Sequence, residues 1–137
     1  MSRSLILIFF AFLLGLTTLL YLTQLVASER IEVVELYTLN EKGEEIITRL
    51  WVVDDGGYQY LRVGADGSEW FDRLQSAEVA DLTRNSRRYS YSWSTKQNKS
   101  AQINQLMRDK YGWGDSFIGF LTGGRYGSIP IELRLVQ

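Results

Sequence analysis

The most pronounced pattern along the chain is an uncharged apolar run near its N-terminus, from Leu5 to Ala27, rich in Leu, Ile and Phe. A helix rises about 1.5 Å per residue, so this run extends about 34 Å, enough to cross a hydrocarbon core of roughly 30 Å. The pattern predicts a transmembrane helix that contacts membrane lipid through residues 5–27. It divides the chain into an N-terminal anchor, residues 1–28, and a globular domain, residues 29–137.

A cleaved signal peptide is the alternative interpretation of this run, because Val26, Ala27 and Ser28 offer small residues near a cleavage point. The apolar run is longer than the roughly 7 to 15 residues of a typical signal-peptide core, which favours the uncleaved anchor. Arg3 precedes the run, and Glu29 begins an acid-rich stretch after it. The positive-inside rule therefore predicts a cytoplasmic N-terminus and an extracytoplasmic domain, either periplasmic or extracellular.

Beyond the apolar run, the hydrophobic pattern is typical of strands. Ile31 to Leu39 and Ile46 to Val53 carry apolar residues on both faces and are predicted to pair around the turn Asn40 to Gly43. A second hairpin joins Ile46 to Val53 with Tyr58 to Val63 through Asp54-Asp55-Gly56-Gly57, which suits a tight turn. Strands with two apolar faces are expected where a sheet closes into a barrel and helices cover it.

The rest of the domain mixes helical spacing with strand-like alternation. In chain order, the predicted elements are a short helix over Glu69 to Leu74 capped by Ser68, a short helix or turn over Ser76 to Arg84, a strand over Arg87 to Ser94 with Tyr89, Tyr91 and Trp93 on one face, a helix over Asn98 to Tyr111 with Ile103, Leu106, Met107 and Tyr111 on one stripe, a short helix over Ser116 to Leu121, and a closing strand over Ile129 to Val136.

Caps and breakers set the expected ends of these elements. We expect Asn98 or Ser100 to cap the long helix, Gly112 to end it and Asp115 to cap the following short helix. Pro130 indicates an edge position or the start of a strand, because proline has no N–H to donate. Five strands and two or three helices predict a small split antiparallel β-barrel, mainly β, preceded by one transmembrane helix. A three- or four-stranded sheet with helices on one side is the alternative.

Composition limits the chemistry available to the chain. It contains no Cys and no His, which excludes disulfides, thiol nucleophiles, zinc sites of the usual kind and Ser-His-Asp catalysis. We therefore expect no metal, and we assign no general acid, base or nucleophile. If the protein is an enzyme, a cofactor carries the reaction.

The order strand, turn, strand, polar Gly loop and aromatic helix from Ile46 to Leu74 resembles the flavin- and deazaflavin-binding split β-barrels, most closely their deazaflavin-dependent nitroreductase-like branch. Trp70, Phe71 and Leu74 match the Trp-aromatic-x-x-Leu helix start of that branch. The resemblance covers about residues 33–94. It implies an oxidoreductase-like barrel that binds FMN or a deazaflavin coenzyme, often between the two subunits of a homodimer.

A flavin-type site needs cations and backbone N–H groups for phosphate, and a flat apolar surface against the ring. For Arg49 and Arg62 the alternative role is pairing with acids such as Asp54, Asp55 or Asp72. For the aromatic side chains, including Trp51, the alternative is packing in the core. The resemblance implies the following cofactor-binding candidates: Thr48, Arg49, Arg62, Gly64, Ser68, Trp70, Lys110 and Tyr111.

One turn departs from the pattern of the branch. Its members usually carry a basic turn where this chain has Glu41-Lys42-Gly43-Glu44-Glu45, and acidic residues there repel a coenzyme phosphate. Two functions therefore stay open. One is a membrane-anchored flavin- or deazaflavin-dependent oxidoreductase of unknown substrate. The other is a non-catalytic, membrane-tethered interaction module that retains the barrel without a cofactor. The acidic turn favours this module, whereas the set Arg49, Arg62, Ser68 and Trp70 favours the oxidoreductase.

The formal net charge of -1 conceals a basic stretch between Leu82 and Arg108 that contains no acid. Bases interleaved with aromatic residues are typical of nucleic-acid surfaces. The anchor and the near-neutral charge argue against nucleic acid as a partner. Anionic lipid headgroups or a solvated polar edge are the better interpretations of these bases, which are Arg84, Arg87, Arg88, Lys96 and Lys99.

Overall fold

The computed structural model describes residues 3–29, 32–65, 67–112, 114–115 and 127–137, and the chain forms two compact units, Met1–Glu32 and Val33–Gln137. The first unit contains helix α1 (Arg3–Glu29), which the apolar run predicted. Among the described residues, Ser4–Leu22 is the one stretch long and apolar enough to cross a membrane, and none of it is buried. A signal sequence near the N-terminus can meet the same criteria of length and hydropathy.

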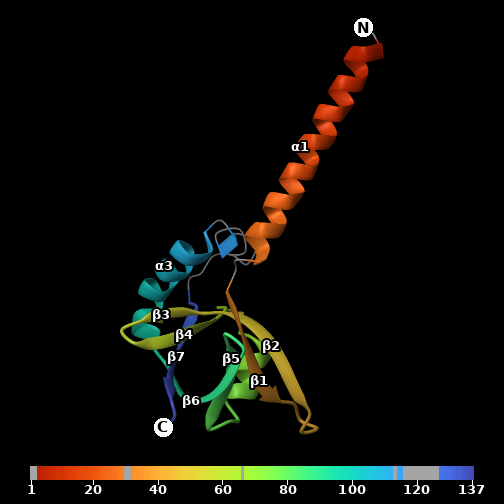
Figure 1. Cartoon of the computed structure of the whole chain (residues 1–137). Helices are drawn as coiled ribbons and strands as arrows, with labels where there is room; N and C mark the ends of the chain where they lie inside the picture. Colours follow the sequence, from red (N-terminus) through yellow and green to blue (C-terminus); the bar gives the residue numbers. More distant parts are fainter. Residues whose placement is uncertain (1–2, 30–31, 66, 113, 116–126) are drawn as a thin grey trace. The chain divides into compact units, whose positions relative to one another are not determined.

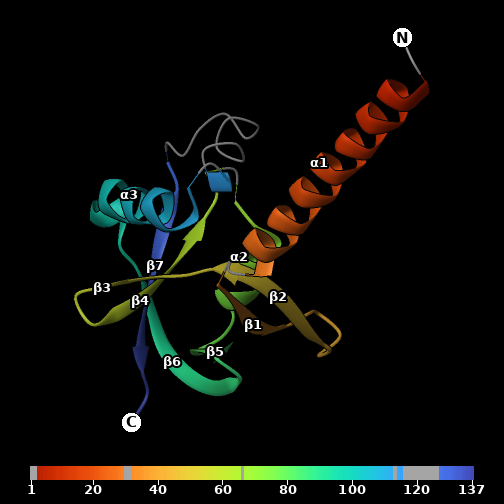
Figure 2. The same cartoon turned by 45° about the horizontal axis from the view of Figure 1, so that its top comes forward.

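The second unit is a curved, seven-stranded antiparallel sheet that forms a half-barrel with helices α2 (Glu69–Leu74) and α3 (Ser100–Tyr111) (Figures 1 and 2). The order of strands across the sheet is β2-β1-β5-β6-β7-β4-β3. The strands are β1 (Val33–Leu39), β2 (Glu45–Trp51), β3 (Val53–Asp55), β4 (Tyr58–Val63), β5 (Val79–Arg84), β6 (Arg87–Thr95) and β7 (Ile129–Leu135).

Both predicted hairpins are present, with one correction. β1 pairs antiparallel with β2, as predicted. In the second hairpin Gly56 and Gly57 have φ angles of 58° and 84°, the left-handed geometry of a type I′ turn. The predicted strand Ile46 to Val53 is two strands separated at Val52, so that β2 pairs with β1 and β3 pairs with β4.

The prediction of a helix or turn over Ser76 to Arg84 was wrong, because most of this segment is strand β5. Ala80 and Leu82 are buried, and β5 pairs with both β1 and β6. Together with the division of the second strand, this raises the number of strands from the predicted five to seven. Pro130 lies near the start of β7, as its second residue, which is one of the two predicted positions. It is not at an edge of the sheet, since β7 lies between β4 and β6.

The long predicted helix is confirmed, although its start differs. A 3-10 turn, η1 (Gln97–Lys99), precedes α3, and Lys99 occupies the N-cap position without a side-chain hydrogen bond. Ser100 instead donates through Oγ to the carbonyl oxygen of Ser128, at 2.9 Å. Gly112 ends the helix with a φ of 59°. The helix predicted over Ser116 to Leu121 lies outside the described residues.

Two hydrophobic clusters occupy opposite faces of the sheet, so the alternative with helices on one side was wrong. On the inner face, Trp70, Phe71 and Leu74 of α2 pack against strand residues such as Leu36 and Leu61. On the outer face, α3 covers β3 and β4 through the predicted stripe, with Leu106 partly buried at its margin. Each fully buried side chain of this size contributes about 1.5–3 kcal/mol. The buried residues of this outer cluster are Val53, Tyr60, Ile103, Met107 and Tyr111.

Candidate functional site

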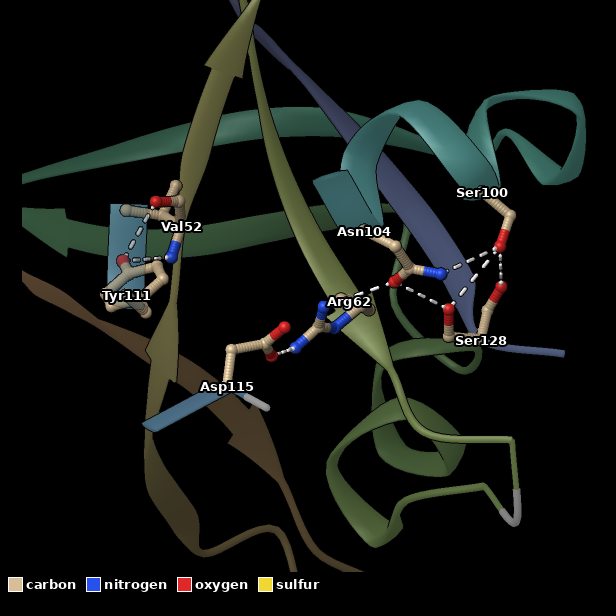
Figure 3. A network of polar contacts seen from close by, with 7 residues as sticks. All are labelled: Val52, Arg62, Ser100, Asn104, Tyr111, Asp115 and Ser128. Carbon is tan, nitrogen blue, oxygen red and sulfur yellow. Dashed lines mark hydrogen bonds and ion pairs between the residues drawn. The ribbon is translucent and has the colours of Figure 1, made fainter. Parts of the chain in front are cut away.

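Arg62, a predicted phosphate ligand on β4, lies in a buried polar network (Figure 3). Its guanidinium donates to the Asp115 carboxylate and, at 3.1 Å, to Oδ1 of Asn104. The side chains of Arg62 and Asp115 are 6% and 1% exposed. Ser128 Oγ also donates to Asn104 Oδ1, at 3.0 Å, so the network joins β4, α3 and the residue before β7. A buried carboxylate needs such a partner, because an unpaired charge is costly away from water.

Lys110 and Tyr111, two further candidates, contact the backbone where β2 ends and β3 begins. The Tyr111 hydroxyl accepts from the Val52 N–H at 3.0 Å and donates to the Val52 carbonyl at 2.9 Å (Figure 3). The Lys110 ammonium donates to the same carbonyl at 2.7 Å. The Tyr111 ring stacks on Trp51, with centroids 4.5 Å apart and an interplanar angle of 8°. These contacts stabilise the break between the two strands.

The remaining candidates lie on β2 and around α2. Arg49 is exposed on the edge strand β2, opposite Glu35. Thr48 Oγ1 accepts from Arg73 at 3.5 Å. The other three are Gly64, whose carbonyl accepts from Gly67 at 3.0 Å, Ser68, which is the N-cap of α2 without a side-chain hydrogen bond, and Trp70, which is 7% exposed in the core. The described contacts therefore divide the eight candidates among separate surroundings, and they do not join them in one network.

Most bases of the predicted basic face are neutralised by acids of the same domain. Asp54 and Asp55, expected as partners of Arg49 or Arg62, are paired with other bases. The face is therefore a network of ion pairs, which favours the solvated polar edge over a lipid or nucleic-acid surface. The pairs are Arg84 with Asp54 at 2.7 Å, Arg88 with Glu45 at 2.9 Å and with Asp81 at 3.2 Å, Lys96 with Glu132 at 3.8 Å, and Lys99 with Asp55 at 2.8 Å.

A second buried polar group lies on the outer face, and sequence reasoning missed it. The Tyr60 hydroxyl donates to the Glu132 carboxylate, which also accepts from Arg134 at 2.8 Å. Burial raises the pKa of the Tyr60 phenol, and its bond to Glu132 raises it further. Burial alone raises the pKa of the Glu132 carboxyl, but hydrogen bonds from Tyr60 and Arg134 and the charges of Lys96 and Arg134 hold it below its ordinary value. Glu132 is 3% exposed, so this pair has a structural role.

A cavity of about 600 Å³ lies beside the β1–β2 hairpin and α2. Arg88 lies over the Tyr37 ring, 3.7 Å from its centroid, and Arg73 forms another part of the wall. The Arg88 guanidinium is engaged by acids, and further carboxylates line the cavity. Four acids against two bases make this an unfavourable place for a phosphate; the acids are Glu41, Glu45, Asp72 and Asp81.

Among the described residues, no three acidic side chains lie close enough together to hold a metal ion. The protein is defined by its half-barrel sheet, by one helix on each face of the sheet, and by the buried polar networks around Arg62 and Glu132. The fold is a split β-barrel.

Comparison with known proteins supports this class. No protein-family model and no curated protein matches the sequence. Solved structures that are similar include HutZ, the heme storage protein from Vibrio cholerae (TM-score 0.57, 9% identity, 81% of this chain and 86% of that chain). A domain-swapped dimer is similar with a TM-score of 0.57 and 11% identity, over 77% of this chain and 80% of that chain. The F420-H2 dependent reductase FDR-A is similar with a TM-score of 0.54 and 12% identity, over 74% of this chain and 93% of that chain. At these identities the similarity shows the fold alone.

Proposed function

We propose that this chain is a membrane-tethered split-barrel module that acts by binding and holds no flavin or deazaflavin. The observation that carries the proposal is the engagement of Arg62 by Asp115 and Asn104 inside the domain. A coenzyme phosphate that bonds to Nη2 of this guanidinium has to displace Asp115. Breaking a buried ion pair in this way typically costs about 3–5 kcal/mol, which a single phosphate contact does not offset.

The other predicted cation-bearing positions lead to the same conclusion. Lys110 and Tyr111 hold the Val52 peptide, so their polar atoms already have partners. Arg49 is exposed, and it lies on β2, the strand that follows the acidic turn. The large cavity near Arg73 carries an excess of acids. The chain therefore keeps the fold of cofactor-binding barrels while its own residues do not fit a flavin phosphate.

Membrane anchoring by α1 is the second part of the proposal, with the N-terminus in the cytoplasm and the domain outside it. Apolar side chains along the helix are exposed, including Phe12 at 71% and Leu14 at 70%. A continuous apolar surface of this kind is stable in lipid and promotes aggregation in water. N-terminal sequencing of the protein from isolated membranes tests it. A start at Met1 or Ser2 supports the anchor, and a start near Ser28 indicates a cleaved signal peptide.

A flavin- or deazaflavin-dependent oxidoreductase is the second candidate function. It is favoured by the similarity in fold to an F420-H2 dependent reductase. When bound, such a ring would supply hydride or electron transfer, and the protein would supply its position.

Titration of the full chain, in non-ionic detergent micelles, with FMN and separately with a deazaflavin coenzyme distinguishes the two functions. We expect no saturable change in absorbance or fluorescence at micromolar concentrations. Saturable binding that Arg49→Ala weakens, while Arg108→Ala on the exposed face of α3 does not, would overturn the binding-module proposal. Arg49 is exposed, so its replacement leaves the fold intact.

A homodimer is a further expectation for the tethered protein. Leu39 and Ile47 are 60% and 55% exposed on the neighbouring strands β1 and β2, and they offer an apolar surface for a contact between two copies. One similar structure is a domain-swapped dimer. Sedimentation equilibrium in density-matched detergent tests the expectation, and a protein mass equal to one chain across micromolar concentrations contradicts it.

A further inference from the structure

A second cavity lies between the β5–β6 hairpin and β4, and none of the predicted flavin contacts lines it. Its volume is about 530 Å³, within the range of small-molecule sites. We propose that this cavity binds a small organic anion whose phosphate or carboxylate lies between Arg84 and Arg87. Its lining consists of two arginines, two tyrosines and two amides, which are Arg84, Arg87, Tyr89, Tyr91, Gln59 and Asn85.

The two arginines are direct neighbours across the hairpin. Arg84 at the end of β5 is in register with Arg87 at the start of β6. Like charges placed directly opposite one another destabilise an antiparallel pair. The connecting turn keeps them there, since Asn85 and Ser86 have φ angles of 51° and 62°, a left-handed geometry that is unfavourable for serine. An anion bonded to both guanidiniums removes this repulsion through charge-assisted hydrogen bonds.

Only part of this positive charge is compensated within the domain. Asp54 receives two hydrogen bonds from Arg84, at 2.7 and 2.8 Å. Among the described residues, no carboxylate forms an ion pair with Arg87, in contrast to Arg84, Arg88, Lys96 and Lys99. The cavity therefore keeps an excess positive charge at its rim, next to a guanidinium whose donors can receive a ligand.

A polar group deeper in the cavity wall also lacks a partner. Gln59 Nε2 donates to the Tyr91 hydroxyl at 3.1 Å, while Gln59 Oε1 is buried and has no hydrogen-bond partner among the described residues. A hydroxyl both donates and accepts, so Tyr91 can bond either end of the amide. In both orientations one end of the Gln59 amide is left for another molecule. Burying such a group unpaired is unfavourable, and a small rotation of the amide brings it to a ligand in the cavity.

These groups define the chemistry of the ligand. The anionic group bonds to Arg84 and Arg87, and a donor or acceptor next to it satisfies Gln59. The Tyr89 side chain follows Arg87 on the same face of β6 and is 44% exposed, so it offers a ring surface for an apolar or aromatic body. A phosphate monoester or carboxylate on a small ring-bearing molecule meets all three requirements.

Binding of phenyl phosphate to the full chain in phosphate-free maltoside micelles tests the proposal. Isothermal titration gives the affinity, and NMR of the Gln59 side-chain amide locates the ligand. We expect saturable binding that is tighter than that of inorganic phosphate and roughly tenfold or more weaker in Arg87→Ala, because one charge-assisted hydrogen bond is lost. Arg87 is exposed, so this variant folds.

The matched control is Arg108→Ala, which removes an exposed arginine on α3 that donates to Gln105 at 2.7 Å. In this variant we expect unchanged affinity and the same ligand-induced shift of the Gln59 amide signal as in the wild type. Equal weakening by both arginine variants, or no saturable binding to the wild type, overturns the proposal. Competition by micelles containing phosphatidic acid would assign the same site to a lipid headgroup, and its absence assigns it to a soluble anion. Neither result depends on whether the protein binds a flavin.

Discussion

Replacing Tyr111 with Phe removes one oxygen atom and tests whether α3 stabilises the break between β2 and β3. In the native protein this hydroxyl satisfies both polar groups of the Val52 peptide. In the variant the Val52 carbonyl keeps the Lys110 ammonium at 2.7 Å. The Val52 N–H loses its hydroxyl partner at a residue that is 0% exposed.

The expected loss of stability comes from the Val52 N–H, because the Val52 carbonyl keeps a hydrogen-bond donor and the N–H keeps no acceptor from Tyr111. A buried donor left without a partner costs about 1–3 kcal/mol. The ring of Phe retains the stacking on Trp51, so packing changes little. We therefore expect the free energy of unfolding to fall by about 2 kcal/mol. For a domain of roughly 100 residues, this lowers the melting temperature by roughly 8–16 °C.

Urea unfolding of the full chain in non-ionic micelles, followed by tryptophan fluorescence, measures this loss. The matched control is Tyr58→Phe, since Tyr58 is 36% exposed and its ring keeps the contact with Arg134. We expect the control to stay within about 0.5 kcal/mol of the wild type. A loss in Tyr111→Phe no larger than that of the control would refute the structural role and return Tyr111 to the list of candidate ligand contacts.

Three further changes test the polar networks. Arg62→Met removes the guanidinium that pairs with the buried Asp115 carboxylate, so urea unfolding will show a loss of about 3–5 kcal/mol, and adding Asp115→Leu will recover much of it. In the folded protein the pKa of Glu132 lies below its ordinary value of 4.5. The stability that Glu132 contributes is therefore complete above pH 4.5 and is lost as the pH falls through the lowered pKa. Glu132→Gln will flatten this decline in acid unfolding curves. Asp54→Asn removes the acid beside Arg84, and we expect a stability change below about 1 kcal/mol, measured by the same unfolding assay, together with tighter binding of phenyl phosphate in calorimetry.

The features that the sequence predicted correctly depend on neighbouring residues. The β1–β2 hairpin needs one turn, and Gly56 and Gly57 suit a type I′ turn whatever surrounds them. The stripe from Ile103 to Tyr111 follows from helical spacing alone. The long apolar run predicted α1 for the same reason.

The features that were missed depend on contacts between distant parts of the chain. The break at Val52 is stabilised by Tyr111, 59 residues later, so the local pattern indicated one continuous strand. Strand β5 is short, and the burial of Ala80 and Leu82 becomes visible only once β1 and β6 lie on either side. Alternation along β7 places Glu132 among polar positions, and nothing local indicates that it pairs with Tyr60.

The ion pairs of the candidate site likewise could not be predicted from neighbouring residues. A sequence gives the number of basic side chains in a segment, but whether a basic side chain can bind a ligand depends on whether an acid of the same domain pairs with it. Arg62 is engaged by Asp115, 53 residues away, and Arg84 by Asp54, 30 residues away. Arg87 has no such acid among the described residues, although its sequence context differs little from that of Arg88. For this fold, a search for ligand sites should therefore begin with bases whose charge the domain leaves uncompensated, and this criterion selects Arg87 in the hairpin cavity over the predicted phosphate ligand Arg62.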